Sequence, residues 1–471
     1  MRVITSDIEE NEAYLRELYQ DCSDIIFRSF ETGTLCRQKC LIIFADGLCD
    51  KTLICDSMLK TIMNSAYRGG LRIKRSVNLE FGENNIPVPE ISFEEEFEKL
   101  TETVFSGDCA ILIDGESSFM KVSARAFKSR GFQEAESKTV IRGPRDAFTE
   151  NFRDNTMLIR RRLKNPKFKI VMTNLGDETK TAIGICYMEG IAQEGLVALV
   201  QERLAQVQLK SVLESGFIEK ELEKVSPSLF PQVQSTERPD EASAALLEGR
   251  VVIITDNTPF VLILPGLLKS QLTTPADFYE TKSKKIAFFV LRVFAMVFTI
   301  LLPAMYIAIV EYNPEFISDK LILFITHSRK FVPFPSFIEI LFMQFIFEVI
   351  LEAAIRLPKQ IGFTVGIVGS LVVGQAIVDA SLVNIMVVIV VALNATLAFV
   401  IPSWSLVTTV RFLRILFMVV ASLLGFFGIT LAFLAVLIHL SELHLFDIEF
   451  LYPFVDSPNV LKKIEKEENF N

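Results

Sequence analysis

The sequence has little histidine and tryptophan, three and one in 471 residues, and it contains no common catalytic motif. There is no glycine-rich phosphate loop, no HExxH and no nucleophile elbow. His327, His439 and His444 are too dispersed to form an evident acid–base or metal set. A net charge of −9 and the lack of a basic stripe with interleaved aromatics argue against nucleic-acid binding. We therefore expect no enzyme, no cofactor, no metal site and no nucleic-acid partner.

The first 30 residues lack the apolar run of a signal peptide, so we expect the amino-terminal part to stay in the cytosol. All seven cysteines lie between positions 22 and 186, in this polar part. Cytosolic thiols are reduced, and the spacing fits no standard zinc pattern, so we interpret these cysteines mainly as small buried hydrophobes.

Composition changes near Ser283, which divides the chain into a polar part and an apolar part. Half of the residues are hydrophobic and 22% are charged, and the mean hydropathy is +0.38. These values conflict for one soluble domain but agree for a polar region joined to a membrane domain. We predict an α/β cytosolic region followed by an α-helical polytopic membrane domain.

The polar part contains an internal repeat. Residues 40–62 and 181–204 both indicate a buried strand, a turn and a helix, and residues 105–122 and 247–264 both indicate two strands joined by a turn. The corresponding glycines of the two pairs are almost equally separated: the turn glycines Gly47 and Gly190 by 143 residues, and the helix-end glycines Gly107 and Gly249 by 142 residues. Two pairs at one offset predict two related α/β lobes. The expected lobes are residues 1–140 and 141–275.

A basic segment lies between the two repeats. Arg160, Arg161, Arg162 and Lys164 cluster near the carboxyl end of a predicted helix, where cations are favoured by the helix dipole. Two interpretations remain open: a solvated or lobe-bridging charged face, and a patch that contacts anionic lipid or a partner subunit.

The apolar part, residues 276–456, contains several segments long enough to cross a bilayer, which needs about 20 apolar residues. The lysines at 282, 284 and 285 keep the start of the first segment on the cytosolic side. A polar tail, 457–471, follows. The expected spans lie near 286–310, 361–380, 383–402 and 412–440.

Residues 335–357 form a helix whose membrane position the sequence leaves open. At helical spacing Gln344, Glu348, Glu352 and Arg356 share one face. Burying two carboxylates in lipid would cost roughly 2.5–3.5 kcal/mol each, so we favour an interfacial or re-entrant helix. This gives four crossings with both termini inside but leaves several arginines and lysines on the outer side. If residues 335–357 cross as a fifth span, these basic residues lie on the inner side, but the carboxyl-terminal tail then lies outside.

The segment 361–380 is apolar but unusually rich in glycine. On a helix its small residues lie on one face, which allows close backbone approach. Larger and polar residues lie on the opposite face. This pattern suits a ring of helices around a water path, and it also suits ordinary packing within a bundle. The helix-packing residues are Gly362, Gly366, Gly369, Ser370 and Gly374, and the hypothetical pore-lining residues are Thr364, Val368, Leu371, Val372, Gln375 and Asp379.

Long stretches of the chain resemble the A subunit of the GerA family of spore germinant receptors. The resemblance covers nearly the whole chain and is dense in "GPRDAFTENFRDNTMLIRRRL", "LFPQVQSTERPDEASAALLEGRVVIITDNTPFVLILP", "TPADFY", "PFPSFIEILFMQFIFEVILEAAIRLPKQIGFTVGIVGSLVVGQAIV" and "VRFLRILFMVVASLLGFFGI". The tail "SPNVLKKIEKEENFN" departs from the arginine–proline ending common in the family.

The resemblance implies a multi-pass protein of the inner spore membrane with a cytosolic amino-terminal domain. It implies a homo-oligomer in contact with membrane lipid, working with a transporter-like B subunit and a lipoprotein C subunit. The expected function is a nutrient-gated ion channel that triggers ion release and germination. The alternative is a non-conducting scaffold or accessory subunit of the SpoVAF type that modulates another channel.

Overall fold

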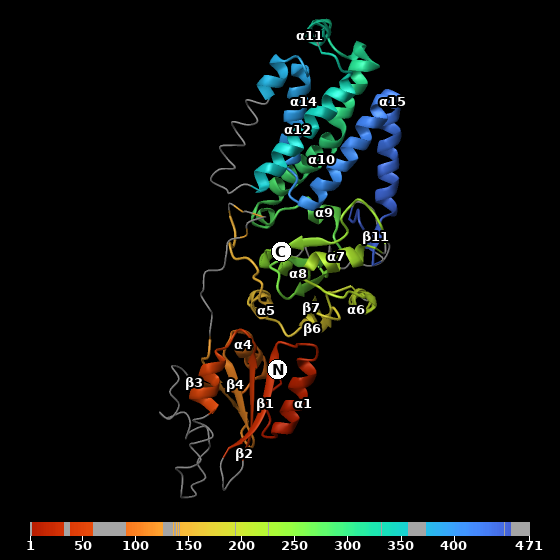
Figure 1. The fold of residues 1–471 in the computed structure, drawn as a ribbon. Helices are drawn as coiled ribbons and strands as arrows, with labels where there is room; N and C mark the ends of the chain where they lie inside the picture. Colours follow the sequence, from red (N-terminus) through yellow and green to blue (C-terminus); the bar gives the residue numbers. More distant parts are fainter. Residues whose placement is uncertain are drawn as a thin grey trace, which may run out of the picture. The chain divides into compact units, whose positions relative to one another are not determined.

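The computed structural model describes residues 2–32, 38–59, 91–125, 135, 138, 140, 142–193, 195–224, 226–330, 332–356, 374–446 and 448–453 (Figure 1). The chain divides into two compact units. We call the first the α/β unit; its described residues lie within Met1–Val225 and Val233–Pro265. We call the second the helical unit; it comprises Ser226–Gln232 and Gly266–Ser457.

The α/β unit begins with a five-stranded antiparallel sheet in the order β1-β2-β4-β5-β3. The central strands β2 and β4 are almost wholly buried, which explains their unbroken runs of apolar residues. The strands are β1 (Ile25–Thr32), β2 (Gln38–Ala45), β3 (Ile91–Glu94), β4 (Cys109–Ile113) and β5 (Phe119–Val122). The helices are α1 (Ile8–Leu18), the π-helix η1 (Leu53–Leu59) and α4 (Phe97–Phe105).

A second five-stranded antiparallel sheet has the order β6-β7-β9-β10-β8, which is the same connectivity as the first. This is the result that the predicted repeat requires. The strands are β6 (Phe168–Leu175), β7 (Thr181–Met188), β8 (Gln234–Thr236), β9 (Val251–Thr255) and β10 (Val261–Leu264). The helices are α5 (Phe152–Arg160), α6 (Leu196–Gln206), α7 (Ser215–Glu223) and α8 (Pro239–Leu247).

The repeat extends to single hydrogen bonds at the start of α1 and α5. Asn11 accepts from Thr5 N at 3.1 Å and donates to Thr5 O at 2.6 Å. Asn155 accepts from Thr149 N at 2.7 Å and donates to Thr149 O at 2.6 Å. Both asparagines are buried, and each holds the turn that precedes its helix. The matching side-chain contacts indicate that both lobes are built from the same repeated supersecondary unit.

Arg160 joins the two lobes. Its guanidinium donates to both carboxylate oxygens of Asp24 at 2.8 Å, and the two side chains are 1% and 3% exposed. The same guanidinium lies over the rings of Phe105 and Phe168, at 4.8 and 4.4 Å from their centroids. The lobe-bridging interpretation of the basic segment is therefore confirmed for Arg160.

In the helical unit, four long helices run alongside one another (Figure 1). They are α10 (Lys282–Glu311), α12 (Ser336–Arg356), α14 (Ile385–Ala398) and α15 (Trp404–Glu442). Short elements connect or flank them: α9 (Leu268–Gln271), η2 (Pro275–Tyr279), η3 (Pro314–Phe316), α11 (Asp319–Arg329), β11 (His444–Leu445) and β12 (Ile448–Glu449).

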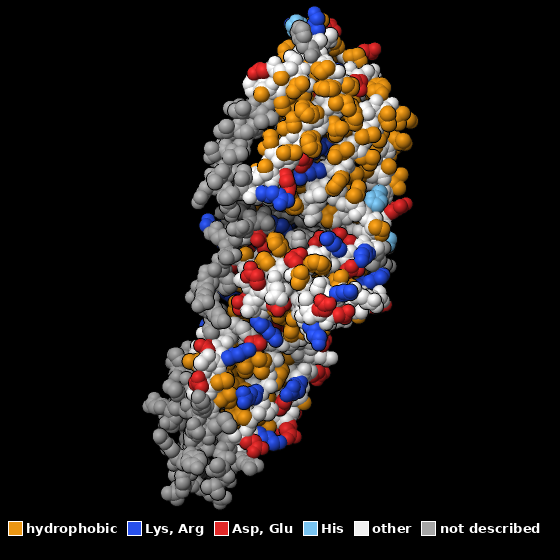
Figure 2. All heavy atoms as spheres, viewed as in Figure 1, with side chains coloured by type: hydrophobic (Ala, Val, Ile, Leu, Met, Phe, Trp, Pro, Cys, Tyr) orange, Lys and Arg blue, Asp and Glu red, His pale blue; other side chains and the backbone are white. Residues whose placement is uncertain are grey.

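The surface of the helical unit is apolar. Figure 2 shows hydrophobic side chains over most of its visible face, whereas charged side chains are interspersed over the α/β unit. Several large side chains are more than two-thirds exposed, among them Leu323, Leu423 and Phe427 at 70%, 69% and 71%. Among the described residues, two helices are long and apolar enough to cross a membrane, α10 and α15. Such a surface is suited to lipid rather than to water.

The predicted spans agree with the helices to different degrees. The first span lies within α10, and α14 is shorter than the third. Within the predicted span 412–440, α15 is broken at Gly425, which has φ 60° and ψ −140°. This backbone conformation is open to glycine and strained for other residues. Of the span 361–380, only the residues from Gly374 onward are described, with a helical turn at 374–379.

A candidate polar site in the helical unit

The candidate site begins with a proline inside α10. Pro303 has no backbone N–H, so the carbonyl of Thr299, four residues earlier, lacks its usual helical partner. Thr299 is fully buried, and a carbonyl left unpaired there would be costly. The Thr299 carbonyl therefore needs a hydrogen-bond donor from another helix.

Asn394 of α14 supplies this donor. With its amide oriented to satisfy both ends, Asn394 Nδ2 donates to Thr299 O at 2.9 Å. Its Oδ1 accepts from Arg414 Nη1 at 3.0 Å and from Gln344 Nε2 at 3.1 Å. Asn394 is fully buried, and apart from the exposed Thr396 the rest of its helix is apolar. One side chain therefore connects α10, α12, α14 and α15.

Glu348 of α12 binds two arginines of α15. Its Oε1 accepts from Arg414 Nη2 at 3.1 Å, and its Oε2 lies 3.3 Å from Arg411 Nη1. The side chain of Arg414 is 3% exposed, that of Arg411 is 21% exposed and that of Glu348 is 34% exposed. Arg411 also lies over the ring of Trp404, 5.1 Å from its centroid. We call the connected set the Glu348 network: Thr299, Gln344, Glu348, Asn394, Arg411 and Arg414.

The network carries a net positive charge, and some of its hydrogen-bonding atoms have no partner within it. Two guanidinium groups face one carboxylate. Arg414 Nε and Gln344 Oε1 are buried and have no hydrogen-bond partner among the described residues. A buried donor and a buried acceptor in one cluster are suited to binding water or an ion. In a membrane helix bundle, ionisable groups of this kind mark a functional region.

A second polar contact fixes the other end of α12 and α14. Glu339 is 1% exposed and accepts from Asn384 N at 2.9 Å. Its carboxylate lies 3.4 Å from Arg329 of α11. Asn384 caps α14 by accepting from Met386 N at 2.9 Å. Together these contacts place a carboxylate at the amino terminus of α14, where the helix dipole favours negative charge.

The predicted polar face of residues 335–357 divides into two parts. Gln344 and Glu348 point into the Glu348 network. Glu352 and Arg356 instead pair with each other at 2.8 Å, with side chains 61% and 77% exposed. Because α12 packs against α10, α14 and α15, its polar face meets protein over part of its length. Its depth in a bilayer stays a prediction.

The predicted pore segment is described only at its end. Gln375 donates to Asp379 at 2.9 Å, and both side chains are exposed. A Cβ added to Gly374 would have no atom within 4 Å, so no described helix packs closely against this glycine. The other predicted residues lie outside the described part of the chain: Gly362, Thr364, Gly366, Val368, Gly369, Ser370, Leu371 and Val372.

Sequence reasoning missed the partners that complete the network. Asn394 was one of a few polar residues within a largely apolar predicted span, and Pro303 and Thr299 lay inside the first predicted span. The available signal was the spacing of four between Thr299 and Pro303, which identifies a freed carbonyl. Arg411 and Arg414 lie at the start of the last predicted span in the sequence, but nothing in the sequence identified Glu348 as their common partner.

Fold and site together define a two-part protein with a duplicated α/β unit and an apolar helical unit that holds charged groups in its interior. Residues 13–465 match the family model described as Bacillus/Clostridium GerA spore germination protein. The chain therefore belongs to the GerA family.

Its relatives match along most of their length. Spore germination protein B1 of Bacillus subtilis is 34% identical, covering 97% of this chain and 93% of the relative. Spore germination protein KA of the same organism is 32% identical, covering 96% and 82%. An uncharacterised B. subtilis membrane protein, YfkQ, is 34% identical, covering 96% and 86%. A crystal structure of the N-terminal domain of the A subunit of the Bacillus megaterium germinant receptor GerK3 matches with 29% identity and a TM-score of 0.46, covering 57% of this chain and 98% of that one.

Proposed function

We propose that this chain is the A subunit of a nutrient germinant receptor in the spore inner membrane. In this proposal, copies of the chain assemble into an ion-conducting channel that opens when nutrient binds to the receptor. A transporter-like B subunit and a lipoprotein C subunit complete the receptor. Membership of the family supports the receptor part of the proposal.

The Glu348 network is the observation that supports conduction. A purely structural membrane bundle gains little from burying one arginine and partly burying a second arginine and a glutamate, because each charge is costly to remove from water. Charges are tolerated where they border a water-filled path. The network joins α10, α12, α14 and α15, and the chain continues from α12 into the segment 361–380, which carries the hypothetical pore-lining residues. We propose that the network fixes the position of α12 and thereby affects the segment that follows it in the chain.

We also propose six membrane crossings. A helix of 21 residues, as in α12, spans about 31 Å, which is enough for the hydrocarbon core. The break at Gly425 divides α15 into segments 404–424 and 426–442, about 31 and 25 Å long. If α12 and both segments cross, together with α10, 361–380 and 383–402, the two termini lie in the cytosol. Arg356 then lies at the cytosolic end of α12, as the positive-inside rule favours, whereas Arg411 and Arg414 lie about 10 and 15 Å into the fifth crossing, counted from Trp404.

Single-cysteine labelling distinguishes this topology from four or five crossings. An impermeant reagent should label Leu382→Cys, which lies outside with five or six crossings and inside with four. It should not label Glu465→Cys, which lies inside with four or six crossings and outside with five. Glu315→Cys is outside in every arrangement and is the positive control. Protection at 382, or labelling at 465, in sealed cells with a cysteine-free background contradicts six crossings.

Conduction is tested with purified receptor in liposomes. Nutrient should start ion release, and Asn394→Leu should change the rate without preventing assembly, because it disconnects Thr299, Gln344 and Arg414. Thr396→Val, on the exposed side of the same helix, is the matched control. A receptor that assembles and binds nutrient but releases no ions would identify this chain as a non-conducting scaffold or accessory subunit.

A further inference from the structure

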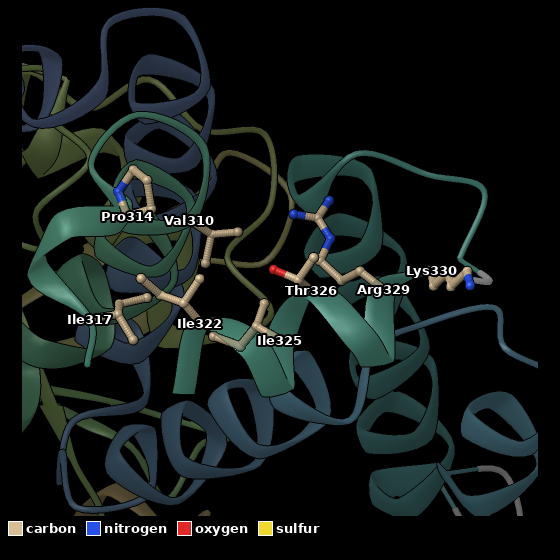
Figure 3. Close-up of a pocket in the computed structure, with 8 residues that line it drawn as sticks. All are labelled: Val310, Pro314, Ile317, Ile322, Ile325, Thr326, Arg329 and Lys330. Carbon is tan, nitrogen blue, oxygen red and sulfur yellow. The ribbon is translucent and has the colours of Figure 1, made fainter. Parts of the chain in front are cut away.

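A pocket of about 310 Å³ lies at the end of α10 away from its lysine-rich start, and residues of α10, η3 and α11 line it (Figure 3). It is separate from the Glu348 network and shares no lining residue with it. This volume is at the low end of ligand pockets, which are about 300–1,000 Å³. The lining residues are Val310, Pro314, Ile317, Ile322, Ile325, Thr326, Arg329 and Lys330.

The pocket has an apolar part and a polar part. Val310, Ile317 and Ile322 lie on one side, and Thr326 and Arg329 lie on the other; Lys330 lies further out, with its amine pointing away from the other lining residues (Figure 3). Among the described lining residues there are two cations and no carboxylate. Such a pocket complements an amphiphile with an aliphatic chain and an anionic head group.

The surface around the pocket is apolar as well. Phe316 is 75% exposed, Leu323 is 70% exposed and Phe324 is 49% exposed, all on η3 or α11. A short helix with exposed aromatic and aliphatic residues next to basic ones is typical of the bilayer interface. At a bilayer interface this element would present its apolar side chains to acyl chains and its cations to lipid head groups.

We propose that this pocket binds an anionic phospholipid. The end of one acyl chain packs against Val310, Ile317 and Ile322, and the lipid phosphate is bound by Arg329, with the Thr326 hydroxyl donating to a head-group oxygen. The flexible side chain of Lys330 turns toward the bound phosphate and adds a second cation. Glu339, which lies 3.4 Å from Arg329, orients that guanidinium. A guanidinium has five donors, so Arg329 can contact the carboxylate and a phosphate together. Bound lipid would then connect α10 to α11, and through Glu339 to α12.

The test uses the full-length protein in detergent with added phosphatidylglycerol or phosphatidylcholine. Native mass spectrometry should show one retained phosphatidylglycerol, and this lipid should raise the Tm more than phosphatidylcholine does. Ile322→Trp fills the apolar side and should abolish both effects. Lys330→Gln should weaken phosphatidylglycerol binding about fivefold, as expected for one cation at a membrane surface.

Lys320→Gln is the matched control, since Lys320 is an exposed cation of α11 that does not line the pocket. It should leave binding unchanged. Equal weakening by Lys320→Gln and Lys330→Gln would show general surface attraction and overturn the proposal. An equal Tm increase from inorganic phosphate would identify a free-anion site and overturn it too, and so would retention of both lipids alike.

Discussion

The charge of Glu348 should stabilise the helical unit far more than that of Glu352, one turn further along the same helix. Glu348→Gln leaves Arg414 charged, 3% exposed and without a carboxylate. Removing one partner of a buried ion pair costs about 3–5 kcal/mol. Because the Glu348 side chain is 34% exposed, we expect the lower end, about 3 kcal/mol. Glu352→Gln removes only an exposed pair four residues apart and should cost about 0.5 kcal/mol or less.

The assay is thermal unfolding of the full-length protein in detergent, followed by the helical circular dichroism signal. At about 2–4 °C per kcal/mol, Glu348→Gln should lower the Tm by about 6–12 °C, and Glu352→Gln by about 2 °C or less. Arg414→Met, added to Glu348→Gln, should recover part of the loss, since the buried charge without a partner is then gone. Equal Tm values for Glu348→Gln and Glu352→Gln would refute the ion-pair account of the network.

Three further substitutions test other parts of the structure. Arg160→Met should cost about 3–5 kcal/mol in urea unfolding, because it leaves the Asp24 carboxylate buried and unpaired between the lobes; a loss under 1 kcal/mol would contradict this. Burial and two nearby carboxylates raise the pKa of Glu219 from 4.5 to about 7, so the folded state loses stability as pH rises from about 4.5 to 7. Glu219→Gln should therefore be more stable than the wild type at pH 8, by up to about 3 kcal/mol, and no more stable at pH 4; a difference independent of pH would contradict this. Gly425→Ala should lower the Tm, at a cost of about 1–3 kcal/mol, because of its positive φ and because the new Cβ would lie 3.1 Å from Tyr312 Cγ; an unchanged Tm would contradict it.

The α/β unit was accessible from sequence because its signals are local. Strand periodicity and turn glycines such as Gly47 and Gly190 can be recognised from a few consecutive residues. Because the lobe is repeated, each of these patterns occurs twice in the sequence. The common strand order followed from those pairs. The Asn11 and Asn155 contacts were not predicted, since an asparagine six residues after a threonine has no distinctive pattern of its own.

The helical unit was harder to predict because its polar contacts join helices that are distant in sequence. Glu348 and Arg414 are 66 residues apart, and Thr299 and Asn394 are 95 apart. Helical spacing identified the polar face of α12 but did not show which half of it was buried. The break at Gly425 was also missed, because glycine is common within membrane helices and only its φ distinguishes a break.

We propose that assembled copies of this chain conduct ions when the receptor binds nutrient. The most direct measurement is ion release from liposomes that contain the purified receptor, recorded with and without nutrient and with this chain omitted. We expect ion release to need both nutrient and this chain, and its rate to change with Asn394→Leu but not with Thr396→Val. Release that persists without this chain, or a complete receptor that binds nutrient and stays ion-tight, would contradict it.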